Sequence, residues 1–391
     1  MKKIKTFMLA AVAMALTAPV FTACSSDDDN KTKTEVVESI VSEFSVNDKK
    51  VAEQKAKSGK KEAVLLIAFG STWNNAFLAF DKTIEAYEKE FPNADVYISF
   101  SSDICINRAS IGENVDDNGN IVRRDYYEPR YLLHAIGAAK YSKIYVQSLQ
   151  VIPGEEFAAV VAAVKKFMNN GYIGDAHLDD AYLAKLSEDE AIRFGMPLLN
   201  SVDEDVPAVA KELNALYKNE AAQGAVAFMG HGNPDSYDTF KANVRYTQLE
   251  NALQAYSTSY FVGTVDMPEN YKQDVLDRMQ KKGINNGKIF LHALMSIAGD
   301  HAHNDMAGDD DAWDADKKSF EVNDEGEVED TSWKNYFSHL GYTCDDDILK
   351  GCVTGLLENT KVRQLWLNHI KRALKNDAGL LDYYHSKNPE E

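Results

Sequence analysis

Short apolar runs alternate with segments of helical periodicity along most of the chain. The first run, 63–69, ends in Gly-Ser-Thr, and the next segment, 76–89, spaces its apolar residues three or four apart. A buried strand followed by an amphipathic helix is the repeating unit of a parallel sheet. Further strands are expected at 96–100 and 143–151, and further helices at 131–139 and 156–168.

The second half of the chain repeats the pattern of the first. In one pair of segments, 143–156 and 288–301, a Lys, an Ile, a Leu, a second Ile and a Gly recur in register. Several matches in the same order indicate an internal duplication. The other matched pairs are 63–70 with 225–232 and 96–103 with 260–266.

This duplication predicts an α/β fold with two similar doubly wound parallel-sheet lobes. We expect an N-terminal lobe over residues 61–205 and a C-terminal lobe over 206–391, with the metal site in the second. Ligands of such sheets bind at the carboxyl ends of the strands, so a cleft between the two lobes is expected there.

The N-terminal segment has the pattern of an export signal. Three lysines precede an apolar run at 7–20, which is too short to span a membrane comfortably. Small residues before Cys24 resemble a lipoprotein cleavage site, which implies a signal peptide over 1–23 and a lipid anchor at Cys24. The alternative is an ordinary signal peptide with an incidental cysteine.

An exported, lipid-anchored protein at the outer membrane follows from the lipoprotein interpretation, on either its periplasmic side or the cell surface. The acidic run 27–29 resembles the export tag of surface lipoproteins. Residues 24–60 are polar and poor in aromatics, so we expect them to form an acidic or polar tether.

Charge and cysteine content exclude some classes of protein. The formal net charge is −19, which disfavours nucleic acid as a partner. Besides Cys24, the chain has Cys105, Cys344 and Cys352, which form no disulfide framework or metal-binding repeat. Cys344 and Cys352 are expected either to pair or to be buried as free thiols.

Three side chains that commonly bind metals follow three strands of the predicted second lobe. His231, Asp266 and His301 each lie where a strand ends, so all three can converge at one edge of the sheet. Two imidazoles and a carboxylate suit Co²⁺, Ni²⁺, Fe²⁺ or Zn²⁺ and leave coordination positions open. Asp300 and His303 are candidate supporting partners or alternative ligands.

Simpler interpretations exist for these histidines and for the others. A histidine beside a glycine is often only a polar loop residue, and this alternative stays open for His231 taken alone. The histidines within expected strands and helices are predicted to be structural: His134, His292, His339 and His369.

Two segments resemble a known family. The segment 226–232, Val-Ala-Phe-Met-Gly-His-Gly, resembles the metal-binding strand of CbiK-type anaerobic sirohydrochlorin cobaltochelatases, which are class II tetrapyrrole metal chelatases. The segment 298–307 matches the family pattern AGDHAxNDMA. The resemblance spans about residues 63–374 and implies two histidine ligands, His231 and His301.

Two positions depart from the family pattern. The family's third ligand is a Glu, and Asp266 stands at that position, so the carboxylate is kept on a shorter arm. Gln150 stands where family members have a His that could act as an axial haem ligand.

The resemblance implies insertion of a divalent metal, which is a substrate, into a tetrapyrrole. Co²⁺ is the first expectation, with Fe²⁺ and Ni²⁺ as alternatives. His231 or His301 could take a pyrrole proton as well as bind metal. Glu156, the repeat partner of His301, is a candidate auxiliary base, and the alternative is a carboxylate that only stabilises a helix N-terminus.

Tetrapyrrole binding would need apolar walls and cationic clamps for the substrate's carboxylates. The arginines at 123, 124 and 130 are further candidate clamps. The alternative is that all of these cationic side chains are only solvated at the surface. The candidate walls are Phe69, Trp73 and Met229, and the candidate clamps are Arg108, Lys241 and Arg245.

Two alternative functions would suit an exported protein. They are a non-catalytic lipoprotein that scavenges tetrapyrroles or metals, and removal of metal from a captured tetrapyrrole. Assembly into a homo-oligomer is left open by the sequence.

Overall fold

The computed structural model describes residues 33–112, 119–172, 176–238, 240–322, 328, 331–349, 351–376 and 379. The chain divides into two compact units, Met1–Glu43 and Phe44–Glu391. Of the first unit only the start of helix α1 (Lys33–Ser58) is described, so the predicted signal peptide and Cys24 lie outside the described residues. In the described part of the chain, no helix has the length and apolar character needed to cross a bilayer.

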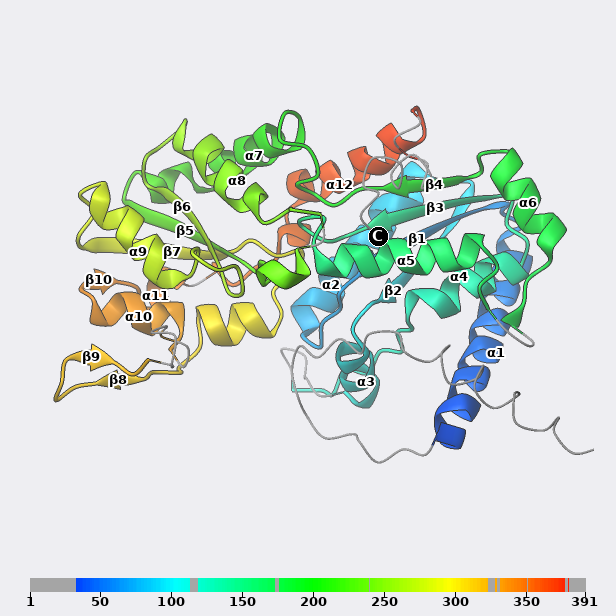
Figure 1. Ribbon diagram of the computed structural model, residues 1–391, viewed down its shortest axis with the longest axis horizontal. Helices are drawn as coiled ribbons and strands as arrows, with labels where there is room; N and C mark the ends of the chain where they lie inside the picture. Colours follow the sequence, from blue (N-terminus) through cyan, green and yellow to red (C-terminus); the bar gives the residue numbers. More distant parts are fainter. Residues whose placement is uncertain are drawn as a thin grey trace, which may run out of the picture. The chain divides into compact units, whose positions relative to one another are not determined.

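Two four-stranded sheets of identical topology form the second unit (Figure 1). The first has the order β2-β1-β3-β4 and the second the order β6-β5-β7-β10, and every neighbouring pair is parallel. The predicted fold of two similar parallel-sheet lobes is therefore confirmed. The strands are β1 (Glu62–Ala68), β2 (Ala94–Phe100), β3 (Lys143–Ser148), β4 (Ile192–Gly195), β5 (Gly224–Gly230), β6 (Tyr260–Thr264), β7 (Gly287–Ala293) and β10 (Tyr342–Thr343).

Helices connect the strands as the periodicity predicts, with short additional elements. A two-stranded antiparallel hairpin, β8 (Trp313–Asp314) and β9 (Ser319–Phe320), lies within the acidic segment of the second lobe. The helices are α2 (Asn74–Glu90), α3 (Asp103–Ile111), α4 (Pro129–Ala138), α5 (Glu155–Met168), α6 (Asp180–Glu188), α7 (Asp205–Ala221), α8 (Val244–Gln254), α9 (Lys272–Lys281), α10 (Trp333–His339), α11 (Asp346–Leu349) and α12 (Thr360–Ala373).

The central strands are buried on both faces, which explains their continuous apolar runs. Successive residues of β1 point to opposite faces: Leu65 packs in a cluster with α4 and α5, and Leu66 packs in a cluster with α2. In β5, Ala227 faces α9 and α10, whereas Phe228 joins the same cluster as Leu66. One hydrophobic core thus runs through both lobes.

The last helix departs from the predicted domain boundary. The sequence predicts a second lobe that runs to residue 391, but α12 returns to the first lobe and packs against β3 and β4. Trp366 Nε1 donates a hydrogen bond to the carbonyl of Gln150 at 3.1 Å, and His369 contacts the carbonyl of Leu198 at 3.3 Å. The lobes are therefore joined by a chain crossover as well as by the shared core.

The tether predicted over 24–60 is wrong in its C-terminal part. Residues 33–58 form α1, and from residue 44 this helix belongs to the folded unit. Val51 and Asn47 are each 1% exposed, and Asp48 contacts His134 Nδ1 at 2.8 Å. The sequence does not reveal this packing, because one of the buried side chains of the helix, Asn47, is itself polar.

Candidate metal centre

Three neighbouring strands of the second lobe deliver the candidate ligands. His231 follows β5 directly, Asp266 lies two residues beyond β6, and His301 begins a short π-helical segment (His301–Met306) after β7. Because β6, β5 and β7 are adjacent and parallel, their carboxyl ends share one edge of the sheet. The structure thus brings the three predicted residues together.

Backbone contacts fix the loops that carry His231 and Asp266. The amide of Asp266 donates to the carbonyl of His231 at 2.8 Å. Gly232 has a φ of +82°, and a Cβ at this position would lie 2.7 Å from the backbone nitrogen of Met267. Only glycine allows this close approach of the two loops.

His231 lies near each of the other two candidate ligands. His231 Nδ1 lies 3.5 Å from an Asp266 carboxylate oxygen, and the His231 and His301 ring centroids are 4.8 Å apart. His231 Nδ1 also lies 2.8 Å from the carbonyl of Gly232. If Nδ1–H donates there, Nε2 keeps a lone pair for a metal or a proton.

His301 is oriented by a carboxylate that the sequence analysis did not assign. Its Nδ1 lies 2.5 Å from a carboxylate oxygen of Asp305, four residues later. Burial acts to lower the pKa of His301, but Asp305, Asp266 and Glu156 outweigh it and leave the pKa above its ordinary value. A carboxylate that holds a histidine in this way is common behind metal ligands. An acid four residues after a candidate ligand was the available sequence signal.

Glu156 reaches the same place from the first lobe. It lies in the first turn of α5 and is near enough to His231 and His301 for their charges to act on its carboxyl group. Burial raises its pKa, the two histidines oppose this, and Asp266 adds to the rise. The start of α5 is tied to the His231 loop because the Glu155 amide donates to Asn233 Oδ1 at 3.1 Å.

Trp73 forms a second contact between the lobes. Its Nε1–H donates to an Asp300 carboxylate oxygen at 2.7 Å, and its ring stacks on His303 at 3.5 Å between centroids and 6° between planes. Arg108 lies 3.4 Å from the other Asp300 oxygen. Asp300 and His303 therefore face Trp73 and Arg108, and burial lowers the pKa of His303.

Among the remaining candidates for tetrapyrrole binding, some side chains are exposed to solvent and others are buried or hydrogen-bonded within the protein. Phe69 is 40% exposed and Lys241 is also exposed. Met229 is fully buried in the core of the second lobe, so the prediction that it lines a binding wall is wrong: its position in β5 points it away from the surface. Arg245 donates to the carbonyl of Asn200 and to Gln248.

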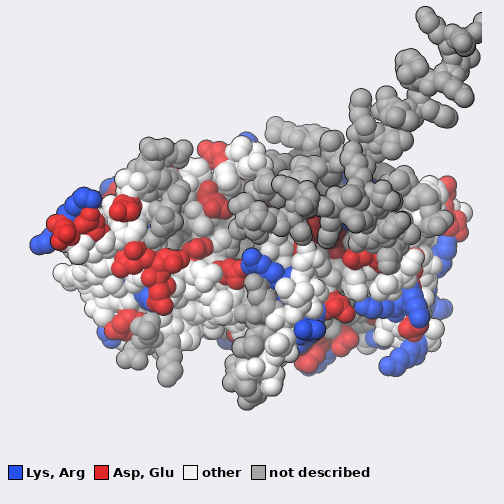
Figure 2. All heavy atoms as spheres, turned by 90° about the horizontal axis from the view of Figure 1, so that it is seen from below, with Lys and Arg blue, Asp and Glu red and all other residues white. Residues whose placement is uncertain are grey.

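Two of the further arginines are paired with acids. Arg124 forms a two-pronged pair with Asp81 at 2.7 Å, and Arg130 pairs with Glu128. On the face shown in Figure 2, basic and acidic side chains of the described residues are interspersed, and no basic stripe crosses it. Cys344 and Cys352 are free thiols, so they do not pair.

Two imidazoles and a carboxylate at the edge of one sheet, faced by an acid of a second lobe, define a two-lobed α/β protein built to handle metal ions. A family model described as cobalt chelatase (CbiK) matches residues 62–323. The chain therefore belongs to the CbiK cobalt chelatase family, a family of metal chelatases.

Two sirohydrochlorin cobaltochelatases and one solved structure are among the proteins that this chain is similar to. The chain is 27% identical over 323 residues to a sirohydrochlorin cobaltochelatase of Salmonella typhimurium, covering 80% of this chain and 97% of the relative. It is 25% identical to the sirohydrochlorin cobaltochelatase CbiKC of Nitratidesulfovibrio vulgaris, covering 80% and 91%. A solved structure of SirB from Bacillus subtilis with Fe³⁺ aligns over 82% of this chain and 98% of its own, at 14% identity and a TM-score of 0.44.

Proposed function

We propose that this protein inserts a divalent metal ion, Co²⁺ in the first place, into a sirohydrochlorin-type tetrapyrrole. The observation that carries the proposal is the convergence of His231, Asp266 and His301 at one edge of the second sheet. The relatives named as sirohydrochlorin cobaltochelatases supply the substrate class. Fe²⁺ and Ni²⁺ suit the same ligands and are the alternative metals.

The proposed site coordinates the metal incompletely, so that the ion can be transferred to the tetrapyrrole. One nitrogen from each imidazole and one oxygen from Asp266 would bind the ion and leave positions open for the incoming pyrrole nitrogens. Asp266 is the weakest of the three, because the family's Glu reaches one methylene further. Asp266→Ala should therefore weaken Co²⁺ binding less than His301→Ala does.

Insertion also requires removal of two pyrrole protons. Each N–H bond breaks as its nitrogen lone pair takes the metal, so no electrons are gained or lost overall. An imidazole that releases the metal can accept one proton, and Glu156, whose pKa is raised by burial, is the candidate acceptor of the second.

Residues of the first lobe would hold the macrocycle. Trp73 and Phe69 offer aromatic surface, and Arg108 offers a cation for a substrate carboxylate. Arg108 is 41% exposed at its side chain and its contact with Asp300 is long, at 3.4 Å. Such an exposed pair is weak, so a carboxylate of the substrate can replace Asp300 on the guanidinium.

A second candidate function rests on the predicted export signal. An exported protein of this family could bind tetrapyrroles or metals for scavenging without turnover, or could remove metal from a captured tetrapyrrole. These alternatives predict stoichiometric binding or loss of a metallated spectrum, whereas a chelatase converts many substrate molecules per chain.

The test is an anaerobic assay of the purified mature protein with sirohydrochlorin and Co²⁺, Fe²⁺ or Ni²⁺, followed by absorbance. We expect repeated turnover to the metallated product, fastest with Co²⁺, and no turnover by His301→Ala. Binding of sirohydrochlorin without any rate above the protein-free control would contradict the proposal.

A further inference from the structure

A second group of metal-ligating side chains lies in the C-terminal lobe, apart from the site described above. Glu220 is near the end of α7, His292 is in β7, and Cys352 follows α11. Each residue offers one ligand atom: a carboxylate oxygen, an imidazole nitrogen or the thiol sulfur. These three atoms lie within 4.8 Å of one another. Three different elements thus deliver an oxygen, a nitrogen and a sulfur to one point.

These side chains are enclosed. The His292 side chain and Cys352 are each 3% exposed, and the Glu220 side chain is 28% exposed. His292 Nε2 lies 2.6 Å from the Glu220 carboxylate, while its Nδ1 is buried and has no hydrogen-bond partner among the described residues. Nε2 is therefore the ring nitrogen that faces the Glu220 carboxylate and can share an ion with it.

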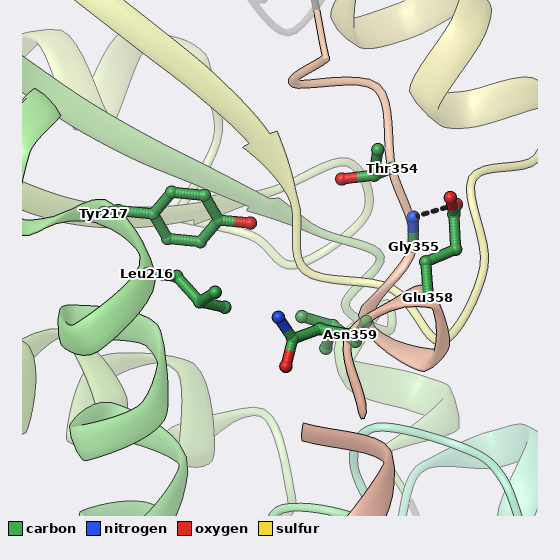
Figure 3. A pocket seen from close by; sticks show the side chains of 7 residues that line it. Leu216, Tyr217, Thr354, Gly355, Glu358 and Asn359 are labelled. Carbon is green, nitrogen blue, oxygen red and sulfur yellow. Dashed lines mark hydrogen bonds between the residues drawn. The ribbon is translucent and has the colours of Figure 1, made fainter. Parts of the chain in front are cut away.

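A pocket lies beside this group. The Tyr217 ring lies against His292, with 3.8 Å between ring centroids and 32° between the ring planes, and the same tyrosine lines a pocket of about 200 Å³ (Figure 3). In Figure 3 the Tyr217 hydroxyl points toward Thr354, two residues after Cys352. The other lining residues are Leu216, Gly355, Leu356, Glu358 and Asn359.

We propose that Glu220, His292 and Cys352 form a second metal site, which binds a borderline divalent ion such as Zn²⁺ or Co²⁺. Thiolate, imidazole and carboxylate are the ligands that these ions take in tetrahedral sites. The site shares no residue with His231, Asp266 and His301, so it is independent of the ion that is inserted.

Metal binding at this site must displace a proton. Burial, with the negative charge of Glu220, raises the pKa of the Cys352 thiol to about 12, and Sγ donates to the carbonyl of Ile348 at 3.2 Å. The ion binds the thiolate and releases that proton to solvent. The Glu220–His292 contact would widen from 2.6 Å to about 3.3 Å, the separation of two ligands on one tetrahedral ion.

The experiment uses the sulfur ligand to separate the two sites. Anaerobic titration of the metal-free mature protein with Co²⁺ alone should produce a near-ultraviolet thiolate-to-cobalt charge-transfer band, because His231, Asp266 and His301 contain no sulfur. The band should disappear in Cys352→Ser and weaken strongly in His292→Gln. It should persist in the double variant His231→Ala/His301→Ala.

Cys344→Ser is the matched control, since Cys344 is a buried free thiol of the same lobe with the same 3% exposure. It should keep the band, and circular dichroism should show that both serine variants are folded. Absence of the band in wild type, its survival in folded Cys352→Ser, or its loss in the His231/His301 double variant would overturn the proposal.

Discussion

His301 and Asp305 lie one turn apart in the π-helical segment, and the imidazole Nδ1 is 2.5 Å from a carboxylate oxygen of Asp305. This contact leaves Nε2 of His301 without a part in the pair, and the His231 ring centroid lies 4.8 Å from that of His301. π-helical turns are rare and are frequent at functional sites. Here the turn places a ligand candidate and its supporting carboxylate together.

Asp305→Asn should weaken Co²⁺ binding about 10–100-fold, because the carboxylate no longer fixes the orientation and basicity of His301. The measurement is anaerobic titration calorimetry with Co²⁺. Asp311→Asn is the matched control: Asp311 contacts His339 at 2.8 Å in the same lobe, outside the candidate site. Equal affinities for Asp305→Asn and wild type would refute the supporting role of Asp305.

Trp73→Phe should lower kcat/KM for the tetrapyrrole about 10-fold and leave Co²⁺ affinity unchanged. The change removes the hydrogen bond to Asp300 and reduces the stacking on His303, each contributing roughly 1 kcal/mol. Trp313→Phe is the control, because Trp313 stacks on His339 in a similar way at 4.7 Å. A change in metal affinity without a change in kcat/KM would contradict a role in holding the macrocycle.

The strands and the three candidate ligands could be predicted because local pattern determines them. Each buried strand is a short apolar run, and His231 and Asp266 lie within two residues of a strand end, whereas His301 lies eight residues beyond β7. Met229 could not be oriented, since a strand buried on both faces has no polar side to set the direction of alternate residues. Asp305 was missed because its four-residue spacing from His301 indicates contact only if the segment between them is helical, and a π-helical turn was not predicted there.

Long-range packing could not be predicted from the sequence. The amphipathic pattern of α12 identifies a buried face but not the lobe that it covers, and Trp366 reaches the carbonyl of Gln150 across more than 200 residues. In α1 the buried positions include Asn47, so the buried side is not purely apolar. In both cases the partner surface, and not the helix sequence, determines the packing.

His369 should make the protein less stable as the pH falls below neutral. Burial lowers its pKa to about 4, and the ring is held by the Leu198 carbonyl and by Arg372, which donates to Nδ1 at 2.9 Å. The unfolded chain, with a histidine pKa near 6.5, takes up the proton first. Between about pH 6.5 and pH 4 this group should remove about 3 kcal/mol from the free energy of unfolding.

The check is urea unfolding at several pH values for wild type and His369→Gln. The difference between the two proteins in free energy of unfolding should be largest above pH 6.5 and shrink toward pH 4. Parallel curves over this range would show that the histidine is not held in its neutral form.

Export and lipidation are a separate prediction from the N-terminal sequence. Cells that express the full chain and are fed a fatty-acid probe should label wild type and not Cys24→Ala. The reason is that acylation at a lipoprotein cleavage site uses that thiol, and Cys105→Ala serves as the control. Equal labelling of wild type and Cys24→Ala would contradict the predicted lipid anchor at Cys24.

The central claim is that the ion held by His231, Asp266 and His301 is the ion that enters the tetrapyrrole. The most direct measurement is an anaerobic single-turnover reaction of Co²⁺-loaded protein, freed of unbound metal, with excess sirohydrochlorin, for wild type, His301→Ala and the surface control His339→Ala. Wild type and His339→Ala should transfer their bound cobalt into the macrocycle, and His301→Ala should transfer none. Transfer by His301→Ala at the wild-type rate, or no transfer of cobalt by the wild-type protein, would contradict the account.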